Sequence, residues 1–278
     1  MRYLNIACYC VNFNDYDFLY EILRKLSFAG VGAELSMFTD DMDFMVQLLG
    51  ERRRFAGYPI TFHGPYMEVE ATAKRGSLEY LKILDAYEMA FEVYRKYDAK
   101  SIVMHTNQRG FDMEEKKELQ DNAVNTIGEI AKRAEKEGIQ LLVENVGESI
   151  HGNLLFDEEE FIYLFQWIPS SVGCLIDIGH AVLNRWNLER VIKELNGRIC
   201  SYHLHNNDGS GDTHRPLFEK NLLLGKKELP QLIRCMEQET PDADWILEYA
   251  PGGHISVDLL EREVRKVLQL RAEAKTTV

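Results

Sequence analysis

Short apolar runs alternate with longer amphipathic stretches along this chain of 278 residues. Most of the runs lack a polar–apolar alternation, which is typical of strands buried on both faces of a parallel sheet. The expected strands are 3–8, 32–37, 60–63, 101–105, 140–145, 172–177, 199–205 and 245–249.

The stretches between these runs have the apolar spacing of helices. In residues 77–97, apolar side chains recur at intervals of three and four, so that one side of a helix would face a core. Residues 113–138 end at a glycine, which is a common helix stop. The expected helices are 16–28, 41–53, 77–97, 113–138, 158–167, 188–195, 227–239 and 257–270.

Eight strands that alternate with eight helices predict an α/β fold, a single (β/α)8 TIM barrel over residues 1–278. Length alone would also allow two small domains, but no Pro/Gly/Ser-rich linker divides the chain. A doubly wound open sheet usually carries a glycine-rich nucleotide turn after its first strand, whereas this one continues into CVNFNDYDF. The tail 272–278 is expected to fray.

Ionisable residues stand at the ends of the last six expected strands and in the loops that follow. In a TIM barrel these ends form the face that carries the active site. A buried charge there is costly unless it is paired or bound to a metal. A cluster of His, Asp and Glu suits a divalent cation such as Zn, Mn, Mg or Co, so the sequence predicts a metal site. Its candidate ligands are His63, His105, Glu144, Asp177, His180, His203, Asp212, His214 and Glu248.

The motifs around these residues are FHGPY, HTN, VEN, DIGH, HLHNNDG, D-x-H and LE. In order and strand position they resemble the xylose-isomerase-like TIM barrel superfamily over roughly residues 60–250. That group contains sugar and sugar-phosphate isomerases and epimerases, inosose dehydratases, and the abasic-site endonuclease IV of AP endonuclease family 2. The resemblance is specific for the superfamily and weak for the substrate.

The resemblance to the isomerases and epimerases implies one metal, held by Glu144, Asp177, His203 and Glu248. Glu144 and Glu248 would act as the catalytic acid/base pair, moving a proton next to a carbonyl through an enediolate. His180 would then bind a substrate oxygen. The expected function is a metal-dependent isomerase or epimerase of a sugar, sugar phosphate or polyol.

The resemblance to the endonuclease implies an alternative, phosphodiester hydrolysis at abasic sites with up to three zinc ions. His63, His105 and Glu144 match the ligands of the first zinc ion. The second ion matches Glu144, Asp177, His203 and Glu248, so that Glu144 bridges the two ions, and the third matches His180, Asp212 and His214. The segment RPLFEKNLLLGKKEL departs from both branches because it lacks their short Gly-x-Gly turn, and Asn206 stands where many sugar-isomerase relatives carry Asp. A barrel that binds a sugar or metal without turnover is the third alternative.

Further residues are candidates for contact with substrate. Tyr66 matches an endonuclease residue that packs against the damaged site, and Glu34 could reach the mouth as a hydrogen-bond anchor. Arg109 and Arg215 flank the ligand loops and could hold a phosphate, although each could equally be a solvated loop residue. His205 is expected to lie behind the ligands rather than among them.

The net charge of -13 argues against a dedicated nucleic-acid partner, because such proteins usually present a basic face to phosphates. No apolar run approaches the roughly 20 residues that span a bilayer, so no membrane partner is expected. The N-terminus has no signal-peptide pattern, and five cysteines without CxxC spacing are expected to be reduced, which favours a cytoplasmic protein. The sugar, the stereocentre, the native metal, the number of ions and the oligomeric state stay open.

Overall fold

The computed structural model describes residues 3–8, 13–146, 153–250 and 255–276. Parallel strands close into a barrel in sequence order, and β1 pairs with β8 to complete it. The closed sheet excludes the open doubly wound alternative. The strands are β1 (Leu4–Cys8), β2 (Gly32–Ser36), β3 (Ile60–His63), β4 (Ile102–His105), β5 (Leu141–Glu144), β6 (Gly173–Asp177), β7 (Ile199–Leu204) and β8 (Asp244–Tyr249).

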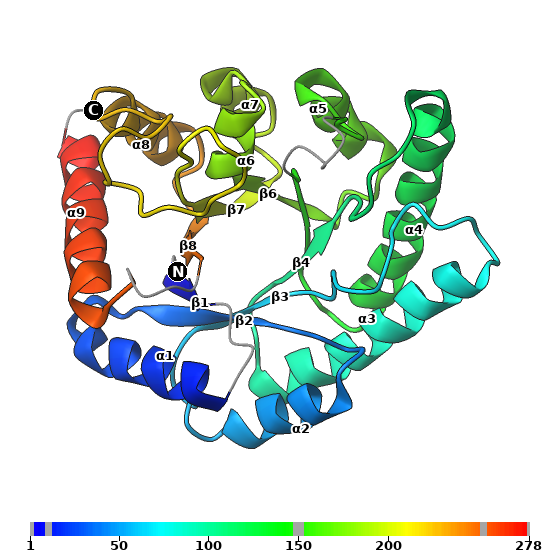
Figure 1. Ribbon diagram of the computed structural model, residues 1–278, viewed down its shortest axis with the longest axis horizontal. Coiled ribbons are helices and arrows are strands. Elements are labelled where there is room, and N and C mark those ends of the chain that lie inside the picture. The colour runs from blue at the N-terminus through cyan, green and yellow to red at the C-terminus, as the bar shows by residue number, and fades with distance from the viewer. Residues whose placement is uncertain (1–2, 9–12, 147–152, 251–254, 277–278) are drawn as a thin grey trace.

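Helices surround the barrel and cover the outer faces of its strands (Figure 1). Short 3-10 turns, η1 (Ser27–Ala29) and η2 (Met113–Glu115), flank two of them. The helices are α1 (Phe13–Lys25), α2 (Met42–Glu51), α3 (Leu78–Tyr97), α4 (Lys116–Lys136), α5 (Glu158–Trp167), α6 (Ile178–Leu183), α7 (Leu188–Glu194), α8 (Glu228–Glu239) and α9 (Val257–Thr276).

Local sequence explains where several helices begin. The Ser77 side chain accepts a hydrogen bond from the Tyr80 amide and caps α3, while Asp157 and Glu160 form a capping box at α5. The apolar face of α3 then packs Tyr87 and Phe91 into the core, where both side chains are fully buried. The cap and the apolar spacing together fix the start and the orientation of such a helix.

Inside the barrel, an apolar layer lies beneath a polar one. The apolar layer is a separate buried cluster of Ala7, Val103, Leu142, Leu175 and Ile246. Two residues after the apolar-layer residue of β4, β5, β6 and β8, each strand carries a candidate ligand. Because side chains alternate between the faces of a strand, those ligands point into the same interior as the apolar layer. They are His105, Glu144, Asp177 and Glu248.

Strand pairing brings the ligands to one level. His105 pairs in register with Glu144, and Asp177 pairs with His203. The carboxyl ends of neighbouring parallel strands therefore present ionisable side chains side by side. The fold itself gathers residues that are far apart in the sequence.

All eight expected strands are found, each with ends within one residue of the prediction. The expected helices are found as well, with larger differences at their ends, and α6 was not predicted. The last helix extends beyond its expected end, because α9 continues to Thr276 and Ala274 is buried; the fraying of 272–278 stays a prediction. Within the described residues, no helix is both long enough and apolar enough to cross a membrane.

Candidate metal centre

Three buried carboxylates, from β5, β6 and β8, converge around one imidazole nitrogen of a buried histidine on β7. His203 Nδ1 lies 3.0 Å from Glu248 Oε2, 3.3 Å from Glu144 Oε1 and 3.7 Å from Asp177 Oδ2. None of the four residues is more than 2% exposed. We call Glu144, Asp177, His203 and Glu248 the central group; one potential ligand atom from each lies within 4.8 Å of the others.

Opposite charges set the ionisation of the central group. Burial disfavours the charged form of His203, but the carboxylates of Glu248, Glu34 and Glu144 hold its pKa well above the ordinary value. Burial likewise opposes ionisation of Glu144, yet His203 and His105 keep the pKa of this carboxyl well below its usual range. The pKa of Glu248 is lowered in the same way against burial, chiefly by His203 and His214. Mutual charge compensation therefore holds the metal-free group together.

A second group shares Glu144 with the first and consists of His63, His105 and Glu144. The Nε2 atoms of His63 and His105 lie 3.1 Å apart, and Glu144 Oε2 is 3.3 Å from the latter. Burial and the charge of His105 lower the pKa of His63, which leaves its imidazole neutral. A neutral imidazole has a lone pair for a metal.

A third group lies around Asp212 and contains His180, His205, Asp212 and His214. Asp212 Oδ2 is 3.0 Å from His180 Nε2 and 2.9 Å from His214 Nε2. Burial opposes ionisation of Asp212, but its hydrogen bonds to these two histidines lower the pKa of the carboxyl. Burial lowers the pKa of His214, but Glu248 and Asp212 outweigh it and raise that pKa to about 9.

His205 is the member of the third group that the sequence did not place among the ligands. Its ring stacks on His214 with centroids 3.9 Å apart and an interplanar angle of 11°. Its Nε2 is 2.9 Å from Asp177 Oδ1 but 3.9 Å from Asp212 Oδ1, so its closest carboxylate belongs to the central group. Its spacing of two from His203 on one strand was the sequence signal for this position.

The donor set fits a divalent metal. All nine ligand positions predicted from the sequence fall into the three groups. Glu144 Oε2 is a buried carboxylate oxygen that has no well-aligned hydrogen bond within the described residues, although His105 Nε2 lies 3.3 Å away. Desolvating such an oxygen is costly unless a cation compensates it. Carboxylate oxygens and imidazole nitrogens together suit zinc, manganese, cobalt or magnesium.

Of the four residues predicted to contact substrate in addition to His180, the structure brings Tyr66 and Glu34 to the groups. The Tyr66 ring lies edge-on to His63 with centroids 4.8 Å apart, at the rim of the second group. Burial, assisted by Glu248, raises the pKa of its hydroxyl to about 12. Glu34 is 1% exposed and lies against His203 rather than at an open surface.

The two arginines pair with glutamates of their own surroundings instead. Arg109 Nη2 is 2.8 Å from Glu79 Oε1, and the Arg109 side chain is 60% exposed. Arg215 Nε donates to Glu219 Oε2 at 3.1 Å, and a second guanidinium nitrogen contacts the same carboxylate. Neither glutamate was considered in the sequence prediction. Glu79 lies on α3 and meets Arg109 only in the folded chain, whereas Glu219 follows Arg215 by four residues.

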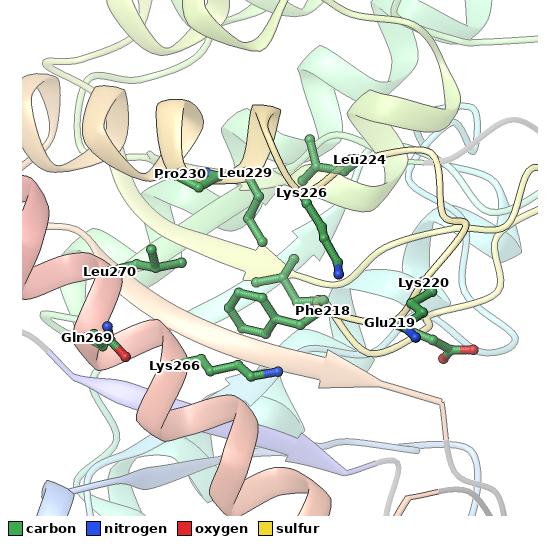
Figure 2. Close-up of a pocket in the computed structure, with 12 residues that line it drawn as sticks. Phe218, Glu219, Lys220, Leu224, Lys226, Leu229, Pro230, Lys266, Gln269 and Leu270 are labelled. Carbon is green, nitrogen blue, oxygen red and sulfur yellow. The ribbon is translucent and has the colours of Figure 1, made fainter.

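A cavity of about 430 Å³ lies away from these groups, between the loop before α8, the start of α8 and α9. Phe218, Leu229 and Leu270 form its apolar wall, with Lys226 and Lys266 nearby (Figure 2). None of the predicted site residues lines it. The chemistry-bearing residues therefore gather at the barrel mouth and not in this outer cavity.

Known structures show the same fold. A D-tagatose 3-epimerase-like protein matches with a TM-score of 0.70 at 20% identity, covering 100% of this chain and 98% of that chain. An L-ribulose 3-epimerase has a TM-score of 0.76 at 13% identity, covering 100% and 97%. An AP endonuclease of family 2 from Brucella melitensis has a TM-score of 0.66 at 17% identity, covering 93% and 96%.

No curated protein sequence matches this chain significantly. The family described as xylose isomerase-like TIM barrel matches residues 20–267, which is most of the chain. This match agrees with the resemblance of the strand-end motifs, and it also agrees with the closed barrel. The chain belongs to the xylose isomerase-like TIM barrel family.

Proposed function

We propose that this protein is a divalent-metal-dependent isomerase or epimerase that acts on a sugar. The observation that carries the proposal is the central group, in which two buried glutamates from β5 and β8 face one histidine nitrogen. Structural neighbours that include a tagatose 3-epimerase-like protein and a ribulose 3-epimerase favour the same class of reaction.

Glu144, Asp177, His203 and Glu248 would hold the metal. When bound, a divalent cation supplies a Lewis acid that polarises carbonyl and hydroxyl oxygens. In the metal-free protein, neighbouring histidines hold Glu144 and Glu248 ionised. The positive charge of a bound cation would favour the same ionised state, in which either carboxylate can accept a proton. One carboxylate takes the proton from the carbon next to the substrate carbonyl. The other returns a proton, acquired from solvent, to the opposite face or to the neighbouring carbon.

The charges around the mouth favour an uncharged sugar over a sugar phosphate. Arg109 and Arg215, the two cations predicted to hold a phosphate, are each neutralised by a glutamate. The segments 9–12, 147–152 and 251–254, which follow β1, β5 and β8, contain no lysine or arginine in the sequence. With both candidate phosphate-binding arginines already paired to glutamates, a free ketose is the favoured substrate over its phosphate.

Turnover in D2O tests this proposal. We would incubate the manganese- or cobalt-loaded protein with a panel of free ketoses and their phosphates and follow the carbon-bound protons by NMR. We expect epimerisation or isomerisation of a free ketose, with deuterium entering at the carbon next to the carbonyl. Glu248→Gln should slow this exchange by about 10²–10⁴-fold, the usual contribution of a general acid or base. Absence of exchange with every sugar, or equal rates in the variant, would contradict the assignment.

Phosphodiester hydrolysis at abasic sites is the second candidate, because the chain has three ligand groups whereas isomerisation requires one. The net charge of -13 weighs against binding to DNA, whose phosphates are negatively charged. A duplex with one abasic site, incubated with the zinc-loaded protein, separates the two activities. We expect no strand cleavage; cleavage that is lost in Asp212→Ala would reverse the order of the two candidates.

A further inference from the structure

We infer that Glu34 is a positioning residue that fixes His203 so that its Nδ1 atom is presented to the metal. The sequence suggested that Glu34 anchors substrate at the mouth. Its contacts instead connect it to a predicted ligand. The inference rests on the proposed metal site but not on the identity of the substrate.

The two nitrogens of His203 face different surroundings. Nδ1 faces the three carboxylates of the central group, at 3.0 to 3.7 Å. Nε2 lies 2.8 Å from Glu34 Oε1, on the other side of the ring. Because a neutral imidazole carries one proton, an Nε2–H that donates to Glu34 leaves the Nδ1 lone pair directed at the central group. Glu34 thereby selects the ring tautomer that suits coordination.

Glu34 is itself held in place by side chains from two neighbouring strands. Its second oxygen, Oε2, accepts a hydrogen bond from Thr61 Oγ1 on β3 at 3.0 Å. Thr61 Oγ1 in turn accepts one from Asn5 Nδ2 on β1 at 3.1 Å, and Asn5 Nδ2 also contacts the Ala33 carbonyl. The chain Asn5–Thr61–Glu34–His203 thus crosses the barrel interior from β1, β3 and β2 to β7.

Burial makes this contact specific. Asn5, Glu34, Thr61 and His203 are at most 1% exposed. Within the described residues, His203 is the only basic side chain that pairs with Glu34. A buried carboxylate with one basic partner and fixed hydrogen-bond donors cannot turn towards substrate without losing these contacts. Carboxylates that orient metal-binding histidines in this way typically change metal affinity by about 10–100-fold when they are mutated.

The metal affinity of Glu34→Gln tests the inference. Glutamine keeps the shape of the Glu34 side chain, but it has no charge to compensate a charged His203 and accepts a weaker hydrogen bond from His203 Nε2. We would titrate Co(II) into the metal-free protein against a chelator and record the visible spectrum of the bound ion. We expect about 10–100-fold weaker binding, a changed cobalt spectrum, and recovery of activity at high metal concentration. Unchanged affinity and spectrum in the folded variant would overturn the inference.

Glu237→Gln is the matched control. Glu237 is also a buried glutamate, but it lies on α8 and its carboxylate pairs with Arg271 of α9. Its substitution should lower stability without weakening the binding of Co(II). If Glu34→Gln does not fold, Thr61→Val removes one anchor of Glu34, and a smaller loss of affinity is expected. Unchanged affinity in a folded Thr61→Val would then overturn the inference.

The metal readout separates this inference from the proposed function. Wild-type protein that binds no cobalt would contradict the metal site and with it the proposed function. Wild-type protein that binds cobalt as tightly as Glu34→Gln contradicts only the role of Glu34. If the wild-type protein binds cobalt but converts no sugar, the proposed function fails. The role of Glu34 is then decided by comparing the cobalt affinities of the wild type and Glu34→Gln.

Discussion

Individual carboxylate–histidine contacts decide the electrostatics of this barrel mouth. Buried carboxylates repel one another unless a positive charge lies between them. In the metal-free protein the histidines provide that charge, since the pKa of His180, His203 and His214 is raised. A metal ion requires the same imidazoles to be deprotonated, so proton and metal compete for one set of atoms.

His214 provides a pH-dependent test of this balance. Its folded pKa, about 9, lies above the ordinary value of 6.5, so its contribution to stability is fully present below pH 6.5 and is lost as pH rises through about 9. In chelator-treated protein, His214→Gln should therefore be destabilising below pH 6.5 and much less so above pH 9. Urea unfolding of both proteins at the two pH values measures this difference. An equal difference at both would show that His214 is not charged in the folded metal-free state.

The strand ends made most of the site predictable at this scale. A His, Asp or Glu that follows an apolar run is visible in the sequence, and a barrel places all such residues on one face. The contact between Glu34 and His203 was not visible, because the two residues are far apart in the sequence and meet only when the barrel closes. The pairing of Arg109 with Glu79 of α3 was missed for the same reason, whereas the pair of Arg215 and Glu219 is only four residues apart in the sequence and was overlooked.

At the scale of elements, α6 connects the central and third groups. It begins directly after β6, with Asp177 as its cap and His180 in its first turn. Six residues without a full apolar period give little helical signal, which explains why the sequence did not predict it. The eight strands, by contrast, were predictable to within one residue because continuous apolar runs end sharply at polar or turn residues.

Gly179 in α6 is predicted to be essential for this connection. A Cβ atom at this position would lie 2.0 Å from His205 Cε1, and His205 contacts Asp177. Gly179→Ala should therefore cost about 1–3 kcal/mol of unfolding free energy, as overpacking does, and should weaken metal binding. Denaturant unfolding and a Co(II) titration of the variant measure the two effects.

Gly128→Ala is the matched control for that substitution. Gly128 lies within α4, and an added Cβ would meet nothing within 4 Å. The change should stabilise the protein by about 0.5–1 kcal/mol through the higher helix propensity of alanine and leave metal binding unchanged. If Gly179→Ala behaves like Gly128→Ala, the close packing of α6 on His205 is not required for the site.

At the scale of the whole molecule, closure of the barrel assembles the site. The candidate ligands come from strands β3 to β8 and the loops after them, and Glu34 adds β2. No half of the chain contains a complete central group together with its supporting contacts. Metal binding and global folding should therefore be coupled, since the unfolded chain does not hold these residues together.

Metal removal should lower the thermal stability of the whole molecule. A ligand present at a hundred times its dissociation constant stabilises the native state by about 2.7 kcal/mol. For a domain of this size, that corresponds to a loss of roughly 5–10 °C in the melting temperature on chelation. Calorimetry with and without chelator measures the shift, and restored metal should reverse it. A melting temperature that does not respond to chelator or metal would show that no ion is bound in the native state.

Metal content per chain tests the central claim most directly. The protein would be purified without added metal, and its divalent ions counted by elemental mass spectrometry, beside His203→Ala treated identically. We predict at least one divalent ion per chain in the wild-type protein, and the loss of one ion in the variant. A wild-type protein without bound metal, even after incubation with manganese, cobalt, magnesium and zinc, would contradict the account.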